Sequence, residues 1–270
     1  MDEDIAYLGL LEDEAIMLDT AALEIAALDH PGVALDQYAD LLTRLTEQLV
    51  RQGGQAGAAS EQADVLADVV GGEFGFTGDR STYDDPDNAD LIRVIDRRRG
   101  LPVSLAILYV AAARRLSWSA DVLNTPGHVL VRINGPAEFV LIDPFERGRP
   151  VDAGDLAALL GRIVGPGTVP TAEHVAAMPS RAVLVRLLMN QATRAEFGGN
   201  TNRALTLYRR MTLIAPSFSH PWWEKARLEL QRDDPAAARA SLSAMLEVTR
   251  DPGMRGHIFG ALDAISSASS

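Results

Sequence analysis

The fold is decided by residues 126–143, which read PGHVLVRINGPAEFVLID. Two aliphatic runs flank Asn134-Gly135-Pro136-Ala137, a combination typical of a hairpin turn. If Ile133 pairs with Glu138 across this loop, His128 and Asp143 lie opposite each other at the open end of the hairpin. Opposite residues have Cβ atoms roughly 4.5–5.5 Å apart. The stretch therefore predicts a carboxylate that orients an imidazole, as cysteine and serine nucleophiles require.

The composition narrows the chemistry that this pair can serve. The 270-residue chain contains no cysteine, which excludes disulfides, thiolate metal sites and thiol catalysis. Its net charge is −12, whereas a general nucleic-acid binder needs a basic face, so we expect no nucleic-acid partner. The histidines lack metal-ligand spacing, and neither a phosphate-binding loop nor a dinucleotide fingerprint is present. We therefore expect no metal and no cofactor.

The sequence predicts neither export nor membrane insertion. The N-terminus is acidic and lacks the basic start of a secretory signal. The longest apolar run without charge, residues 101–113, is shorter than the about 20 residues of a membrane-spanning helix. We expect a soluble, cytoplasmic protein without a membrane partner.

The chain divides into four stretches. Apolar residues recur at three- and four-residue steps through much of residues 1–60, which predicts a helical N-terminal region. Residues 61–160 are expected to form the core, in which Pro102 opens a buried helix ahead of the hairpin. Glycine and proline within residues 161–180 predict a linker, and residues 181–270 return to a helical pattern.

The C-terminal stretch contains an internal repeat. Three pairs of residues lie 34 positions apart: Ala204 and Ala238, Tyr208 and Leu242, and Met211 and Met245. A helix–turn–helix period of this length is the spacing of tetratricopeptide repeats. Such helix pairs either support the core by packing or form a groove for a partner peptide.

Several motifs together point to a known family. They are GFTGD at 75–79, YDDPDN at 83–88, VIDRRRGLPVSL at 94–105, PGHVLVR at 126–132 and IDPF at 142–145. In this order and spacing they resemble the SirB-type branch of the transglutaminase-like superfamily, over roughly residues 5–250. The resemblance implies an α+β fold. Its papain-like core has a buried helix on an antiparallel sheet, with helical N-terminal and tetratricopeptide-like C-terminal additions.

The resemblance also implies where reactive groups lie. Active members of the superfamily place a cysteine at the start of the buried helix, followed by a histidine and an aspartate on adjacent strands. His128 and Asp143 match the last two positions. The cysteine position falls around residues 102–104, where this chain has none.

Two interpretations of the site follow. In one, Ser104 replaces the cysteine, His128 activates it and Asp143 holds the histidine, which would make a serine-dependent hydrolase or acyltransferase. In the other, Ser104 caps the helix or fills a small space, and the histidine–aspartate pair fixes a strand end or lines a binding pocket. We predict mainly the latter: a degenerate, non-catalytic module that binds a protein or peptide.

Two other groups are candidate binding residues. Arg97, Arg98 and Arg99 complement a helix C-terminus or, alternatively, bind a partner's carboxylate beside the pocket, with one of them paired to a nearby aspartate. Trp222 and Trp223 are adjacent and so point to different faces of a helix. One is expected in the core, and the other could be an exposed anchor.

Overall fold

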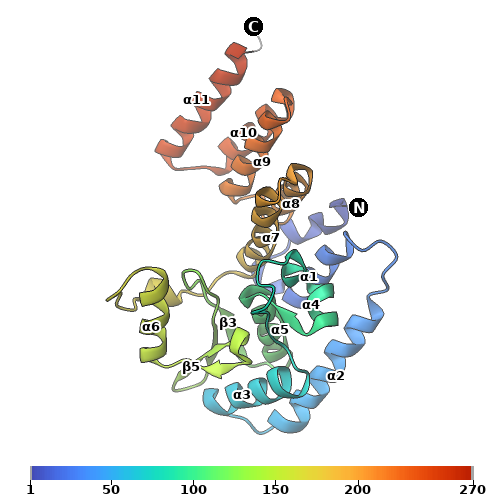
Figure 1. Ribbon diagram of the computed structural model, residues 1–270, viewed down its shortest axis with the longest axis vertical. Helices are drawn as coiled ribbons and strands as arrows, with labels where there is room; N and C mark the ends of the chain where they lie inside the picture. Colours follow the sequence, from blue (N-terminus) through green and yellow to red (C-terminus); the bar gives the residue numbers. More distant parts are fainter. Residues whose placement is uncertain (1, 269–270) are drawn as a thin grey trace. The chain divides into compact units, whose positions relative to one another are not determined.

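The computed structural model describes residues 2–268 as two units (Figure 1). The larger unit is Asp13–Leu187, and the smaller one joins the chain up to Glu12 to the chain from Leu188 onward. The predicted boundaries at 60, 160 and 180 do not coincide with this division. The predicted linker lies in the larger unit because its backbone bonds to the sheet: Asn124 donates to Ala176 (2.8 Å) and Met178 donates to Val122 (2.8 Å).

The larger unit combines helices with a small sheet. Its helices are α1 (Leu18–Ala27), α2 (Asp36–Gly53), α3 (Ala59–Leu66), α4 (Leu91–Arg97), α5 (Pro102–Arg115), α6 (Ala153–Ile163) and the start of α7 (Ser180–Phe197). Four strands form an antiparallel sheet in the order β3 (Ser119–Val122), β4 (Val131–Asn134), β5 (Phe139–Asp143) and β6 (Arg149–Pro150). Two short strands, β1 (Thr77–Gly78) and β2 (Arg99–Gly100), form a separate parallel pair.

Helix α5 is the centre of this unit. Pro102 is its first residue, where the missing N–H has no intrahelical partner to lose, and all residues from Pro102 to Ala113 are buried. In Figure 1, α5 lies next to β3 on one side and next to α1 and α4 on the other. The prediction of a buried helix against an antiparallel sheet is confirmed.

The opposite face of the sheet is covered by α6. Leu156 and Leu160 on this helix pack against Leu123, Leu130 and Leu141 from the sheet region. Side chains alternate between the two faces of a strand, so β4 and β5 can contact α5 and α6 at once. Helix α3 also packs against β4 and β5, so three helices cover the sheet.

The hairpin has a different register from the predicted one. Ile133 pairs with Val140, not with Glu138, so the prediction is wrong by two residues. The loop is closed by the N–H of Gly135, which donates to the carbonyl of Glu138 at 2.8 Å. A shift of two residues keeps every side chain on its expected face, because the period of a strand is two.

The smaller unit is helical. It contains a 3-10 helix at Asp2–Gly9, the end of α7, α8 (Thr201–Ile214), α9 (Ser219–Gln231), α10 (Pro235–Val248) and α11 (Pro252–Ala268). The N-terminal 3-10 helix packs on α8, and the guanidinium of Arg210 lies 3.0 Å from the carboxylate of Asp2.

Backbone conformation also repeats after 34 residues. Gly199 and Asp233 both have positive φ angles, +73° and +59°. The following residues, Asn200 and Asp234, both cap the next helix by accepting a backbone N–H three residues on, at 3.1 and 3.0 Å. Aspartate tolerates the left-handed conformation better than most residues, so the second turn forms without glycine. Assignment to the tetratricopeptide family stays a prediction.

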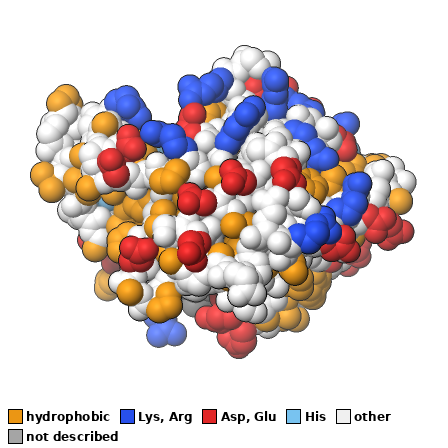
Figure 2. Space-filling model, turned by 90° about the horizontal axis from the view of Figure 1, so that it is seen from below, with side chains coloured by type: hydrophobic (Ala, Val, Ile, Leu, Met, Phe, Trp, Pro, Cys, Tyr) orange, Lys and Arg blue, Asp and Glu red, His pale blue; other side chains and the backbone are white. Residues whose placement is uncertain are grey.

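Two general features are the distribution of charge on the surface and the apolarity of the helices. On the face drawn in Figure 2, acidic and basic side chains are interspersed with apolar ones. Across residues 2–268, no helix combines the length and the apolarity that crossing a bilayer requires.

Candidate functional site

His128 and Asp143 form the polar pair that the sequence predicts. Nε2 of His128 lies 2.9 Å from Oδ2 of Asp143, and the two side chains are 14% and 12% exposed. Asp143 ends β5, and its Oδ1 accepts the N–H of Phe145 (2.9 Å), which caps a short 3-10 helix at Pro144–Glu146. His128 lies in the turn before β4. The pair therefore meets although the strand register differs from the prediction.

The turn that carries His128 is held from α7. The guanidinium of Arg186 donates to the carbonyl of His128 at 2.9 Å and to Oδ1 of Asn124 at 2.8 Å. Burial lowers the pKa of Arg186, while the charge interaction with Tyr83 raises it. No local sequence pattern marks Arg186, because it lies 58 residues from the histidine that it positions.

A second histidine–aspartate pair has the same geometry. Nε2 of His30 lies 2.7 Å from Oδ2 of Asp90, while Oδ1 of Asp90 accepts the N–H of Arg93 and caps α4. In both pairs one carboxylate oxygen caps a helical turn and the other holds an imidazole. This arrangement stabilises local structure by itself, so His128 and Asp143 need a further feature to be a functional site.

That feature is a cavity of about 550 Å³ at the pair. It is lined by Arg80, His128, Asp143, Phe145, Glu146, Arg149, Leu159 and Arg162. The rings of His128 and Phe145 meet edge to face, with centroids 6.1 Å apart. Its volume lies within the range of about 300–1,000 Å³ that is typical of ligand pockets, and Phe145 and Leu159 are the apolar members of a mainly polar lining.

Ser104 is placed away from the chemistry predicted for it. Its side chain is 0% exposed, and its hydroxyl lies 2.8 Å from the carbonyl of Asn88 and 2.9 Å from that of Leu101. Within residues 2–268, the hydroxyl makes no hydrogen bond to His128. Its single proton is already shared between two backbone acceptors, so Ser104 makes no helix cap but joins the first turn of α5 to the loop at Asn88.

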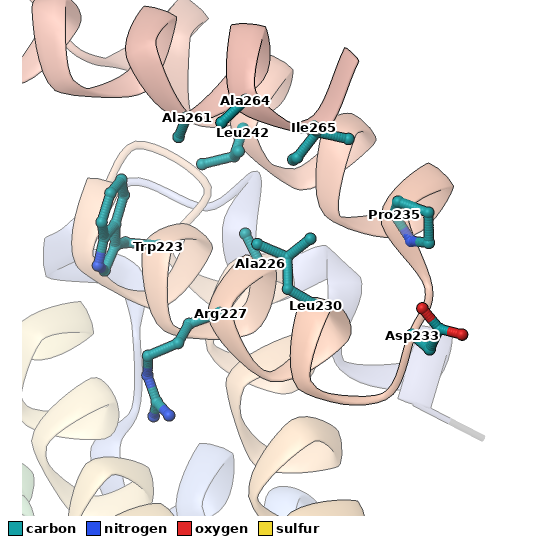
Figure 3. Close-up of a pocket in the computed structure, with 10 residues that line it drawn as sticks. All are labelled: Trp223, Ala226, Arg227, Leu230, Asp233, Pro235, Leu242, Ala261, Ala264 and Ile265. Carbon is teal, nitrogen blue, oxygen red and sulfur yellow. The ribbon is translucent and has the colours of Figure 1, made fainter. Parts of the chain in front are cut away.

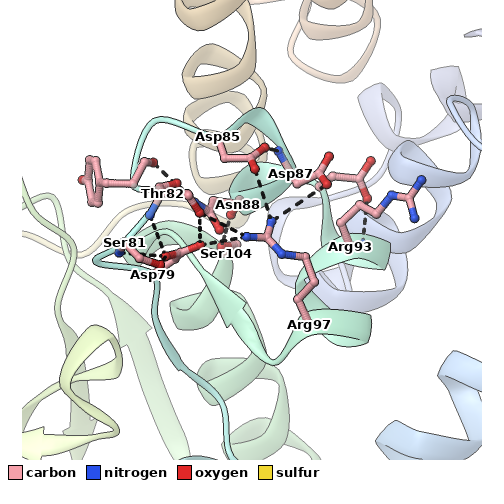
Figure 4. A network of polar contacts seen from close by, with 11 residues as sticks. Asp79, Ser81, Thr82, Asp85, Asp87, Asn88, Arg93, Arg97 and Ser104 are labelled. Carbon is pink, nitrogen blue, oxygen red and sulfur yellow. Dashed lines mark hydrogen bonds and ion pairs between the residues drawn. The ribbon is translucent and has the colours of Figure 1, made fainter.

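The loop that supplies the Asn88 carbonyl is fixed by a buried carboxylate (Figure 4). Asp79 accepts hydrogen bonds from the backbone and hydroxyl groups of Ser81 and Thr82, and from Arg97 at 2.7 Å. Burial by itself raises the pKa of Asp79, but the bonds from Thr82 and Ser81 outweigh burial and bring it well below its ordinary value. The side-chain amide of Asn88 donates to the Thr82 carbonyl at 2.6 Å, which orients Asn88.

The three consecutive arginines do not converge on a site. Arg97 points into this network, and its guanidinium is also 4.0 Å from Asp85, so one of the three arginines does pair with nearby aspartates. Arg98 has a φ of +57° and lies over the ring of Phe76, 4.7 Å from its centroid. Arg99 is exposed on β2. Among the described residues, the arginines that line the cavity are instead Arg80, Arg149 and Arg162, which the sequence analysis missed.

The two tryptophans lie in the smaller unit, and both are half-buried. The indole N–H of Trp222 donates to the carbonyl of Pro216 at 2.9 Å. Trp223 lines a largely apolar cavity of about 670 Å³ formed by α9, α10 and α11, together with Leu230, Leu242 and Ile265 (Figure 3). The expected division into one core and one exposed tryptophan is therefore not what the structure has.

Over residues 2–268, no group of three or more histidines and carboxylates is arranged to hold a metal ion.

Comparison with known proteins gives the family. The model of the transglutaminase-like superfamily matches residues 34–189. A UPF0162 protein of Xylella fastidiosa is 29% identical over 259 residues, covering 93% of this chain and 92% of the relative. The UPF0162 protein PA3419 of Pseudomonas aeruginosa is 31% identical over 252 residues, with the same coverage of both chains. Protein SirB1 of Salmonella typhimurium is 31% identical over 147 residues, covering 54% of this chain and 53% of SirB1. The matched region contains α5, the sheet and the histidine–aspartate pair, so this chain belongs to the transglutaminase-like superfamily.

Proposed function

We propose that this chain is a non-catalytic binding module that holds a peptide segment of a partner protein in the cavity beside His128 and Asp143. One observation carries the proposal. The serine at the start of α5 is buried and bonded to two carbonyls, whereas the histidine–aspartate pair lines a cavity of ligand-binding size. The histidine–aspartate pair is thus available to bind a ligand, whereas the serine at the start of α5 is not placed to act as a nucleophile.

The polar groups of the cavity suit a peptide. Asp143 accepts from Nε2, so a neutral His128 ring has Nδ1 as its remaining acceptor, which a peptide N–H can satisfy. Phe145 and Leu159 supply apolar wall. A fixed acceptor between apolar side chains can select both the orientation and the side chains of a bound segment.

The second candidate is a hydrolase or acyltransferase that uses Ser104, His128 and Asp143. A serine nucleophile needs its hydroxyl within hydrogen-bond reach of the base. The contacts of Ser104 with Asn88 and Leu101 favour the binding function over this one. Exposure of the purified chain to a fluorophosphonate probe should give no label at Ser104, under conditions that label a control serine hydrolase.

The binding function can be tested with a random dodecapeptide display library selected on the full chain. Selected peptides should bind His128→Gln about tenfold more weakly, because the substitution removes the ring and its orientation by Asp143. His257→Gln is a matched control, since His257 is exposed on α11 in the smaller unit.

Two results would contradict the proposal. One is the failure to select any peptide whose affinity depends on His128. The other is a set of peptides that tolerate His128→Gln but are lost with Trp223→Ala, which would place binding in the apolar cavity of α9, α10 and α11. Circular dichroism of each variant would verify that the helices are intact.

A further inference from the structure

We infer that the cavity recognises a carboxylate of an acidic peptide, and that Arg162 is the residue that binds it. The inference rests on the proposed function, because it assigns the chemistry of the ligand at the same site. It starts from the charges that line the cavity.

Three separate elements bring arginines to this cavity. Arg80 follows β1, Arg149 is in β6 and Arg162 is in the last turn of α6. In a chain of net charge −12, this cavity is lined by three guanidinium groups and two carboxylates, Asp143 and Glu146. Arginine presents a planar fork of N–H donors that matches a carboxylate with two parallel hydrogen bonds.

Two of these arginines already have acidic partners. Arg80 forms an ion pair with Glu146, and Arg149 lies 3.5 Å from Asp155. The arginine side chains are 71% and 59% exposed. Exposed ion pairs of this kind contribute only about 0–1 kcal/mol, so the carboxylate of a ligand can exchange with them. A ligand can therefore reach these two arginines only by displacing Glu146 or Asp155.

Arg162 differs from them. Within residues 2–268 it has no carboxylate partner at ion-pair distance. A cation in the last turn of a helix also complements the helix dipole, which would explain its charge without a ligand. Arg162 itself is exposed, but the next residue, Ile163, contacts the turn before His128: a Cβ at Gly127 would lie 2.7 Å from Ile163. The end of α6 thus holds an unpaired guanidinium beside the histidine turn.

The two acidic side chains that line the cavity have partners other than Arg162. Asp143 uses one oxygen for His128 and the other for the N–H of Phe145, and Glu146 is engaged by Arg80. Arg162 has no ion-pair partner among residues 2–268, and its single charge matches a carboxylate better than the double charge of a phosphate. The cavity therefore fits a segment that places an aspartate, a glutamate or a terminal carboxylate near a backbone N–H for His128.

The test uses the peptides selected above. They should share an acidic residue, and changing that residue to its amide should weaken binding about tenfold. Arg162→Gln should weaken the acidic peptide by a similar factor and leave the amide peptide unchanged, so the two changes should not add. Arg99→Gln removes the same charge from an exposed position on β2 and should leave both affinities unchanged.

The outcomes separate the two proposals. Peptides that depend on His128 but bind equally well as amides would overturn the carboxylate assignment and leave the binding function standing. Equal losses with Arg162→Gln and Arg99→Gln would show a diffuse field and not a site, which also overturns it. Tighter binding of a phosphoserine peptide than of its glutamate counterpart would reassign the ligand to phosphate. If no peptide depends on His128, the binding function fails, and the inference fails with it.

Discussion

The placement of Ser104 can be tested with a thiol. Because the chain has no cysteine, Ser104→Cys introduces a single thiol at the position closest to that of the missing nucleophile. If Ser104 faced an open cavity beside His128, this thiol would react at least as fast as an exposed one, because a neighbouring imidazole and a helix N-terminus promote the thiolate. If the serine has the buried position described above, the thiol reacts only after the start of α5 opens.

The size of the effect follows from the first turn of α5. Its neighbours Val103 and Leu105 are 2% and 0% exposed. Burying a valine or leucine side chain fully contributes about 1.5–3 kcal/mol, so an opening that exposes both costs about 3–6 kcal/mol. Every 1.4 kcal/mol is about a factor of ten in the open population, so labelling should slow by about 10²- to 10⁴-fold.

The assay is labelling by a chromogenic disulfide reagent at neutral pH, with and without denaturant. Ser60→Cys is the matched control, since Ser60 is exposed near the start of α3. The urea midpoints of both variants would verify that each is folded. A rate for Ser104→Cys within tenfold of the control rate in the folded protein would refute the buried placement, and the hydrolase interpretation would return.

Three other substitutions test the surroundings of the site. Asp79→Asn should lower the free energy of unfolding by about 2–3 kcal/mol at pH 7, because it leaves Arg97 without its closest carboxylate. As a control, Asp64→Asn on the surface of α3 should change the free energy of unfolding by less than about 0.5 kcal/mol. Because the folded-state pKa of Asp79 is lowered, its stabilisation is present above the unfolded pKa and is lost as the pH falls, so the Asp79→Asn difference in urea titrations should shrink below about pH 4. Gly127→Ala should lower the urea midpoint, since its φ is +62° and a Cβ would meet Ile163, and a midpoint equal to that of the wild type would contradict this packing. Arg186→Met should broaden the ring resonances of His128 in NMR spectra and weaken peptide binding, whereas unchanged spectra would remove its positioning role.

The sequence was sufficient for the architecture but not for the strand register. Periodicity, Pro102 and the hairpin turn predict a buried helix on an antiparallel sheet, which is the structure's core. The register was wrong because two adjacent four-residue loops are compatible with the same turn residues, and backbone hydrogen bonding at Gly135 selects between them. The contact of His128 with Asp143 was still anticipated, since both residues flank the same hairpin.

Long-range partners explain what the sequence could not show. The three arginines at 97–99 have different surroundings because α4 ends at Arg97 and the chain then turns through the left-handed region at Arg98. Arg97 meets a carboxylate 18 residues away, and Ser104 meets a carbonyl 16 residues away. The arginines of the cavity come from three distant segments without any local motif. Such contacts form only in the folded chain, so patterns of neighbouring residues cannot predict them.

The double duty of Asp143 affects how a loss-of-function screen should be interpreted. Alanine at this position deletes a helix cap together with the histidine's partner, so a drop in binding could reflect a loosened β5 end as easily as a damaged pocket. Asparagine keeps an oxygen for the N–H of Phe145 but replaces the other oxygen with a donor. Asp90 makes the same two contacts, with the N–H of Arg93 and with His30. The loss of stability caused by the same substitution at Asp90 therefore indicates how much of a defect at Asp143 comes from lost structure alone.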